Sequence, residues 1–184
     1  MKNIFKLLIL VLMPIFSGCC ENTLLGSYPL PEETETLFPT YTEEHPLKWI
    51  DDNNVEYFGT VANSARETYT MSSECDREDY QIKKATININ NEQYHITATS
   101  TKDPNFVSLE IYRIFEGGRK NFGGSFPLDG FTEVEFRGFK FKDVVVLRYS
   151  PTYYEQEESF IFYHKTKGIE FVYLENDKWY QRKE

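Results

Sequence analysis

Beyond its first quarter, the chain carries apolar side chains at every second residue, in short runs separated by turn residues. In the run 80–90, for example, Ile87 and Ile89 alternate with polar neighbours. A period of two places the apolar residues on one face of a β-strand. No stretch shows a sustained apolar stripe at the spacing of three and four residues that a helix requires. The core must therefore be built from sheets.

About ten such runs follow one another at intervals of about 8–12 residues, as they do in sandwiches and barrels. The expected strands cover residues 47–50, 55–61, 80–90, 94–99, 106–115, 131–141, 143–149, 159–164, 169–174 and 178–182. Aromatic residues make up 16% of the chain, which favours strands because aromatic rings pack well on pleated surfaces. The continuously apolar run from Val144 to Leu147 predicts a central strand covered on both faces. We expect an all-β fold, an antiparallel sandwich or barrel of short strands with little helix.

The N-terminus has the layout of a secretory signal peptide. Lys2 and Lys6 come first, and the apolar run that follows ends in Phe16-Ser17-Gly18-Cys19. That run is too short to span a bilayer, which takes about 20 residues. Small residues directly before a cysteine resemble a lipobox. We therefore expect residues 1–18 to be removed and Cys19 to be lipidated.

The segment 19–46 is expected to be an acylated N-terminus followed by a linker. It contains four prolines, at Pro29, Pro31, Pro39 and Pro46. Prolines at this spacing disfavour helix and ladder pairing, and the acidic cluster Glu32-Glu33-Thr34-Glu35 keeps the segment solvated. The apolar pair Leu37-Phe38 is the exception, because it can dock onto the edge of a domain. Residues 47–184 then form a single β-rich domain.

Three cysteines are present. With Cys19 assigned to the lipid, Cys20 and Cys75 remain, and an oxidising envelope compartment allows these two to form a disulfide. Alternatively, Cys20 is a flexible free thiol and Cys75 is a buried or loop thiol. The sequence contains no geometric test that separates the two possibilities.

The formal net charge is −9 at pH 7, and it becomes more negative once the two lysines of the leader are removed. An acidic surface repels a phosphate backbone, which disfavours nucleic-acid binding. It also disfavours a polybasic contact with anionic lipid. The lipid on Cys19 is then the one membrane contact that the sequence predicts, and two or more acyl chains hold a protein stably.

No pattern typical of a catalytic or metal centre occurs. His45, His95 and His164 are scattered without the spacing of metal ligands. The glycine-rich stretch 117–124 lacks the spacing of a phosphate-binding loop, so we expect a hairpin tip there. The chain also lacks the motifs H-E-x-x-H, C-x-x-C and G-x-S-x-G. We therefore assign no catalytic residue, metal ligand or cofactor.

Tyr153 and Tyr154 form the aromatic pair that is most exposed by its sequence context. They follow Ser150-Pro151-Thr152 and precede an acidic stretch. In a loop they can stack on a sugar or on a partner peptide, which makes them candidate partner-contact residues. Alternatively, both rings fold back over the edge of the sheet.

Two stretches of the chain support a resemblance. The leader motif Phe16-Ser17-Gly18-Cys19 and the late run Tyr163-His164-Lys165-Thr166-Lys167-Gly168-Ile169-Glu170-Phe171, followed by a strand with Trp179, resemble small uncharacterised envelope lipoproteins of Gram-negative bacteria. The resemblance implies a β fold and an envelope location, but no assigned activity. No aspartate follows Cys19 directly, which points to the outer rather than the inner membrane.

We therefore expect a membrane-tethered, non-catalytic envelope lipoprotein whose β domain binds a protein or glycan partner. The alternative is a lipocalin-like carrier of a small apolar ligand, because closed barrels of about eight strands can hold one ligand. An internal cavity of roughly a few hundred Å³ would favour the carrier. A hydrolase would instead need a deep cleft in which histidine and acidic groups converge.

Overall fold

The computed structural model describes residues 23–38, 47–73, 75–149 and 158–183. The elements in these residues are β1 (Thr23–Tyr28), η1 (Glu32–Leu37), β2 (Leu47–Asp51), β3 (Glu56–Asn63), β4 (Glu67–Ser72), β5 (Asp76–Ile89), β6 (Glu92–Ser100), β7 (Phe106–Phe115), β8 (Gly118–Pro127), β9 (Thr132–Phe136), β10 (Phe139–Arg148), β11 (Phe160–His164), β12 (Gly168–Tyr173), η2 (Glu175–Asp177) and β13 (Trp179–Lys183). The two η elements are short 3-10 helices. The predicted all-β fold with little helix is confirmed. In these ranges, no helix has the length and apolar character needed to cross a membrane.

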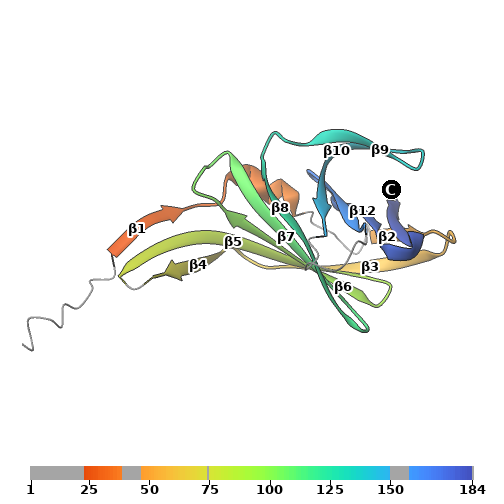
Figure 1. Cartoon of the computed structure of the whole chain (residues 1–184), viewed down its shortest axis with the longest axis horizontal. Helices are drawn as coiled ribbons and strands as arrows, with labels where there is room; N and C mark the ends of the chain where they lie inside the picture. The colour runs from red at the N-terminus through yellow and green to blue at the C-terminus, as the bar shows by residue number, and fades with distance from the viewer. Residues whose placement is uncertain (1–22, 39–46, 74, 150–157, 184) are drawn as a thin grey trace, which may run out of the picture.

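All of these strands belong to one hydrogen-bonded sheet. Its order is β8-β7-β6-β5-β3-β2-β13-β12-β11-β10-β9, and β1 and β4 flank the first half of β5 on its two sides. Neighbours along this order are antiparallel, whereas β1 runs parallel to β5. An isolated bridge between Phe122 and Tyr149 joins β8 to the chain just after β10. The sheet therefore curls back on itself into a barrel-like shape (Figure 1).

The inner face of the curled sheet is filled by large side chains. Along β6 the buried positions alternate with more exposed ones, so that Tyr94 and Ile96 point inward. Trp49, Tyr163 and Tyr180 come from β2, β11 and β13 and are fully buried in the same cluster. The alternating pattern of the sequence thus becomes one continuous core, because each strand contributes its apolar face to the same interior.

A second apolar cluster lies on the opposite face of β10, β11 and β12. Its buried members are Phe141, Val144, Phe160, Phe162 and Phe171. The β9–β10 hairpin covers this cluster, since Phe136 meets the rings of Phe160 and Tyr173 edge-on, at centroid distances of 5.0 and 5.2 Å. Val144 faces this second cluster, and the next residue, Val145, faces the main core. The predicted cover on both faces is therefore confirmed, whereas the predicted central position is not, because β10 lies next to β9 at the end of the strand order.

The run 131–141, predicted as one strand, is two strands in the structure. β9 and β10 meet at Arg137-Gly138, where φ is +51° and +82°. Glycine adopts this left-handed region without the steric cost that a Cβ brings. The chain therefore reverses at Gly138, and the reversal is what folds β9 over the second cluster.

The predicted linker over 19–46 is wrong for its described part, residues 23–38. This segment forms β1 and η1, and its residues Leu30, Leu37 and Phe38 are buried in the main core. The hydroxyl of Tyr163 donates a hydrogen bond of 2.6 Å to the backbone oxygen of Leu37. The prolines break helix as expected, but the apolar residues between them pack against the domain, since burying them gains about 25 cal/mol per Å².

Replacing Leu37 with alanine is expected to lower the free energy of unfolding by about 2–5 kcal/mol, because a buried leucine loses its packing and leaves a cavity. Leu25 on β1 is 58% exposed, so L25A is a matched control that should change stability by less than about 0.5 kcal/mol. Urea denaturation followed by tryptophan fluorescence measures both values. Equal effects of the two substitutions would contradict the docking of this segment.

Candidate functional site

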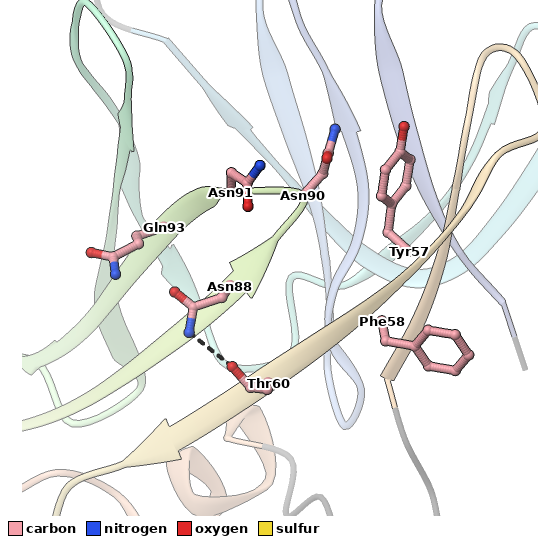
Figure 2. A pocket seen from close by; sticks show the side chains of 7 residues that line it. All are labelled: Tyr57, Phe58, Thr60, Asn88, Asn90, Asn91 and Gln93. Atoms are coloured by element: carbon pink, nitrogen blue, oxygen red, sulfur yellow. Dashed lines mark hydrogen bonds between the residues drawn. The ribbon is translucent and has the colours of Figure 1, made fainter.

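A surface hollow of about 470 Å³ lies where β3 separates from β5. Its lining residues are Tyr57, Phe58, Thr60, Asn88, Asn90, Asn91 and Gln93. β3 pairs with β5 only from Thr60 onward, and before that point it pairs with β2 on its other side. The two strands therefore diverge beyond the Thr60–Asn88 pair, and the hollow opens between β3 and the β5–β6 hairpin (Figure 2).

The point of divergence is fixed by a side-chain bond and a close backbone approach. The amide of Asn88 donates a hydrogen bond of 2.9 Å to the hydroxyl of Thr60, the last contact before the strands separate. A Cβ on Gly59 would lie 2.9 Å from the backbone oxygen of Asn88. Glycine is thus required at this crossing, because any side chain would push β3 away from β5.

The turn of the β5–β6 hairpin supplies two more amides. Asn90 and Asn91 have φ values of +44° and +63°, the left-handed conformation that tight hairpins need and that asparagine tolerates. The Asn90 amide also donates to the hydroxyl of Tyr180 at 3.3 Å. Gln93 follows on β6, directly opposite Asn88 in the register, so both side chains lie on the same face.

A buried ion pair supports this hairpin from inside the barrel. Arg113 of β7 donates two hydrogen bonds of 2.8 Å to the carboxylate of Glu92, and the Tyr94 hydroxyl donates a third at 2.8 Å. Burial raises the pKa of Glu92, but the bonds and charge of Arg113 outweigh it and hold the pKa below the ordinary value. Burial and the neighbouring Glu92 charge raise the pKa of Tyr94 well above its ordinary value. Because Glu92 directly follows Asn91, this pair fixes the turn that lines the hollow.

The two aromatic residues of the hollow are held differently. The Tyr57 hydroxyl donates to the Asp51 carboxylate at 2.9 Å, and its ring meets that of Tyr180 edge-on at 6.0 Å. Phe58 points to the other side of β3 and is 65% exposed, with the Lys48 ammonium 5.9 Å from its ring centre. The hollow therefore has one fixed phenol and one exposed ring at its rim (Figure 2).

This lining has the chemistry of a site for an uncharged polar ligand. Each of the four carboxamides offers N–H donors and a carbonyl acceptor, and Thr60 adds a hydroxyl. The side chains that line the hollow include no carboxylate, ammonium, imidazole or thiol. Donors and acceptors of this kind are suited to hydrogen bonding with hydroxyl and amide groups.

A second hollow of about 280 Å³ is lined by Glu158, Tyr173, Leu174, Glu175, Asn176 and Asp177. Its acids have cationic partners: Lys120 contacts Glu175 at 2.6 Å, and Arg137 contacts Asp177 at 2.5 Å. These contacts neutralise the carboxylates of Glu175 and Asp177, so the hollow has little net negative charge with which to attract a cation. Within the described ranges, no group of three or more histidine, cysteine, aspartate or glutamate side chains is placed to hold a metal ion.

The predicted cysteine chemistry falls mostly outside the described residues. Cys19 and Cys20 lie there, whereas Cys75 stands just before β5, and its backbone oxygen accepts a hydrogen bond of 2.9 Å from Thr23. Cys75 is disulfide-bonded. Its pairing with Cys20, rather than with Cys19, stays a prediction.

The predicted partner-contact residues Tyr153 and Tyr154 also lie outside the described residues, as does His45. His95 shares a hydrogen bond of 3.0 Å with the hydroxyl of Thr86 on the outer face of the sheet. The ring of His164 accepts a hydrogen bond from the Thr166 backbone N–H at 3.0 Å, in the turn between β11 and β12. The two described histidines therefore lie on different elements.

Replacing Glu92 with glutamine is expected to lower the free energy of unfolding at pH 7 by about 3–5 kcal/mol, because Arg113 would stay buried without its carboxylate. E135Q is the matched control: Glu135 lies 3.9 Å from Lys140 at an exposed site, and losing such a pair costs less than about 1 kcal/mol. Urea denaturation of the three proteins measures the differences.

The effect of E92Q should also depend on pH. Because the pKa of Glu92 lies below its ordinary value of 4.5, the contribution of its charge is complete above about pH 4.5. It is lost as the pH falls through the pKa of the folded state. The stabilities of the wild type and E92Q should then converge in acid. A difference that stays constant down to acid pH would contradict this electrostatic role.

Comparisons of the chain with family models, with curated proteins and with solved structures found no match. The function proposed below therefore rests on the hollow between β3 and the β5–β6 hairpin and on the pattern of the N-terminal sequence.

Proposed function

We propose that this protein is a membrane-tethered envelope lipoprotein that binds a neutral glycan in the hollow between β3 and the β5–β6 hairpin. The observation that carries the proposal is the lining of that hollow, in which four carboxamides of the β5–β6 hairpin face the stretch of β3 that carries Tyr57, Phe58 and the Thr60 hydroxyl (Figure 2). Sugars present many hydroxyls, which amides bind as both donor and acceptor. Their C–H faces stack on aromatic rings such as that of Phe58.

The negative charge of the chain limits the kinds of glycan that can bind. The chain has a net charge of −9, so its field repels anionic polymers. Lys48 lies beside Phe58 at the rim of the hollow, and one ammonium does not offset that field. Neutral or N-acetylated sugars therefore fit the hollow better than sulfated or phosphorylated ones, and an N-acetyl group would match the donors and acceptors of the four amides.

The tether proposed at Cys19 would be short. The four residue steps from Cys19 to Thr23, where β1 begins, span at most about 14 Å even when fully extended. The domain would thus sit close to the lipid headgroups, because β1 and η1 are part of the fold and not a stalk. Acylation with two or more chains would hold it there stably. This arrangement suits a ligand that is itself part of the envelope.

The alternative of a lipocalin-like carrier has less support. The main core is filled by large side chains, among them Trp49, Tyr94, Tyr163 and Tyr180. The two hollows described above are open at the surface and are lined largely by polar residues. An apolar cargo would prefer an enclosed apolar cavity, so a glycan on the surface is the better fit.

Replacing Phe58 with alanine is expected to weaken glycan binding by about two- to tenfold, since one aromatic contact contributes about 0.5–1.5 kcal/mol. Q93A should weaken binding as well, because it removes an amide from the lining. The full chain, purified in a zwitterionic detergent, is titrated by calorimetry with chitotetraose and maltotetraose, and with heparin as an anionic control.

The matched control is F106A. Phe106 is also exposed, but it lies on β7 opposite Pro127, away from the lining of the hollow. Binding that survives in F106A and falls in F58A supports the site. Absence of binding to both neutral oligosaccharides, or an equal loss in F58A and F106A, would contradict it.

Replacing Cys19 with alanine is expected to abolish incorporation of a clickable fatty acid in a bacterial host, because the thiol is the acceptor of the lipid. C75A is the control, since it removes a different cysteine that lies far from the leader in sequence and leaves Cys19 in place. Persistence of the label in C19A would overturn the lipid tether. Fractionation of labelled membranes then measures whether the wild type resides in the outer or the inner membrane.

A further inference from the structure

β4 is an edge strand of the sheet, and all six of its residues are exposed. It pairs with β5 on one side, and on the other side no described strand pairs with it. Tyr69 and Met71 are more than half exposed. Together with β1 and the first half of β5 it forms a three-stranded extension that projects from the barrel-like body (Figure 1).

The hairpin that precedes β5 shows which backbone groups of β4 face outward. Ser73 and Asp76 exchange two backbone hydrogen bonds, so this pair is of the hydrogen-bonded kind. Such pairs alternate along an antiparallel ladder, and the β4–β5 register has no irregularity. Tyr69 and Met71 therefore point their backbone groups toward β5. Thr68, Thr70 and Ser72 point theirs away from it.

The other strand edges of the described sheet carry features that oppose further pairing. β1 has an irregular register between Leu24 and Gly26, β9 carries Glu133 and Glu135, and β8 ends in Pro127. Bulges, charges and prolines are the usual protection of sheet edges. The stretch of β4 from Thr68 to Ser72 has none of these, because it is regular, uncharged and free of proline.

We propose that the free edge of β4 pairs antiparallel with β4 of a second copy of this chain, about a two-fold axis at Thr70. The proposal rests on the symmetry of the edge. With Thr70 opposite Thr70, the outward residues Thr68 and Ser72 of one copy meet Ser72 and Thr68 of the other. Each of the three pairs exchanges two hydrogen bonds, so the strand's outward donors and acceptors all find partners.

The side chains are complementary in the same register. Tyr69 of one copy lies opposite Met71 of the other, on both sides of the axis, and sulfur–aromatic contacts of this kind are favourable. Tyr69 is also opposite Tyr80, whose ring lies 4.9 Å from that of Tyr28. The dimer would therefore continue a row of aromatic rings across two copies. No like charges meet, because residues 68–72 carry none.

The contact is small, which predicts a weak and reversible dimer. A single pair of short strands falls in the class below about 1,200 Å² of buried surface, typical of transient complexes. If both copies are tethered to one membrane, as proposed above, their effective concentration rises and favours pairing without any new contact. The strand contact itself does not depend on the tether or on the glycan.

The test uses charge at the two-fold axis. The full chain is studied in a zwitterionic detergent by sedimentation velocity over a range of concentrations. T70K and T70D should each dimerise about fivefold more weakly than the wild type or worse, since each places two like charges directly opposite one another. An equimolar mixture of T70K and T70D should recover dimers to within about threefold of the wild type, because the opposite charges then meet.

T132K and T132D are the matched controls, since Thr132 is an exposed threonine on β9. They should dimerise like the wild type. A wild type that stays monomeric at all concentrations would overturn the proposal, as would a mixture of T70K and T70D that shows no recovery. Glycan binding by T70K should be unchanged, so failure of the dimer and failure of the glycan site can be told apart.

Discussion

The backbone pairing of β5 is the constraint on which the rest of the structure depends. This strand runs from Asp76 to Ile89 and pairs with four others, with β1 and β4 along its first half and β3 and β6 along its second. Its second half belongs to the barrel-like body and ends at the turn that lines the hollow. Its first half leaves that body and forms the extension. One long strand thus joins the surface proposed to bind a glycan and the strand edge proposed to pair with a second copy.

The ion pair between Glu92 and Arg113 links the turn after β5 to β7. A carboxylate this deeply placed is stable only because the guanidinium and the Tyr94 hydroxyl satisfy it. The turn that carries Asn90 and Asn91 is therefore held in place by contacts within the protein, without a ligand. Ligand binding to a site fixed in advance loses less conformational entropy, which would favour the ligand proposed for this hollow.

The sequence predicts those parts of the fold that depend on local signals, namely the alternation of apolar residues and the turn residues between strands. The strand expected over 106–115 matches β7, and the closing strands near β11, β12 and β13 were placed correctly, because alternation and turn residues are local signals. The sequence predicts only that Leu37 can dock onto the edge of a domain. It does not predict that residues 23–38 form a strand and a 3-10 helix. The partner of Leu37, Tyr163, is far away in sequence, and no local pattern reports such a contact.

The candidate site was missed for the same reason. Asn90 and Asn91 were recognised as turn residues, but their meeting with Phe58 depends on where β3 leaves β5. That point is set by Gly59 and the Thr60–Asn88 bond, which have no distinctive signature in one sequence. The aromatic excess was better understood: most of these rings pack in the two apolar clusters, as their preference for strands suggests.

The parallel pairing of β1 with β5 has a mechanical consequence. Both strands begin at the outer end of the extension, and the body of the domain lies at the other end of β5 (Figure 1). A pull on the chain before Thr23 therefore acts along β1 and loads its hydrogen bonds to β5 together, in shear, instead of opening them one by one. A protein that is anchored at its N-terminus and whose domain binds an immobile polymer would experience such a shear force. This strand arrangement resists it better than a hairpin that could be unzipped.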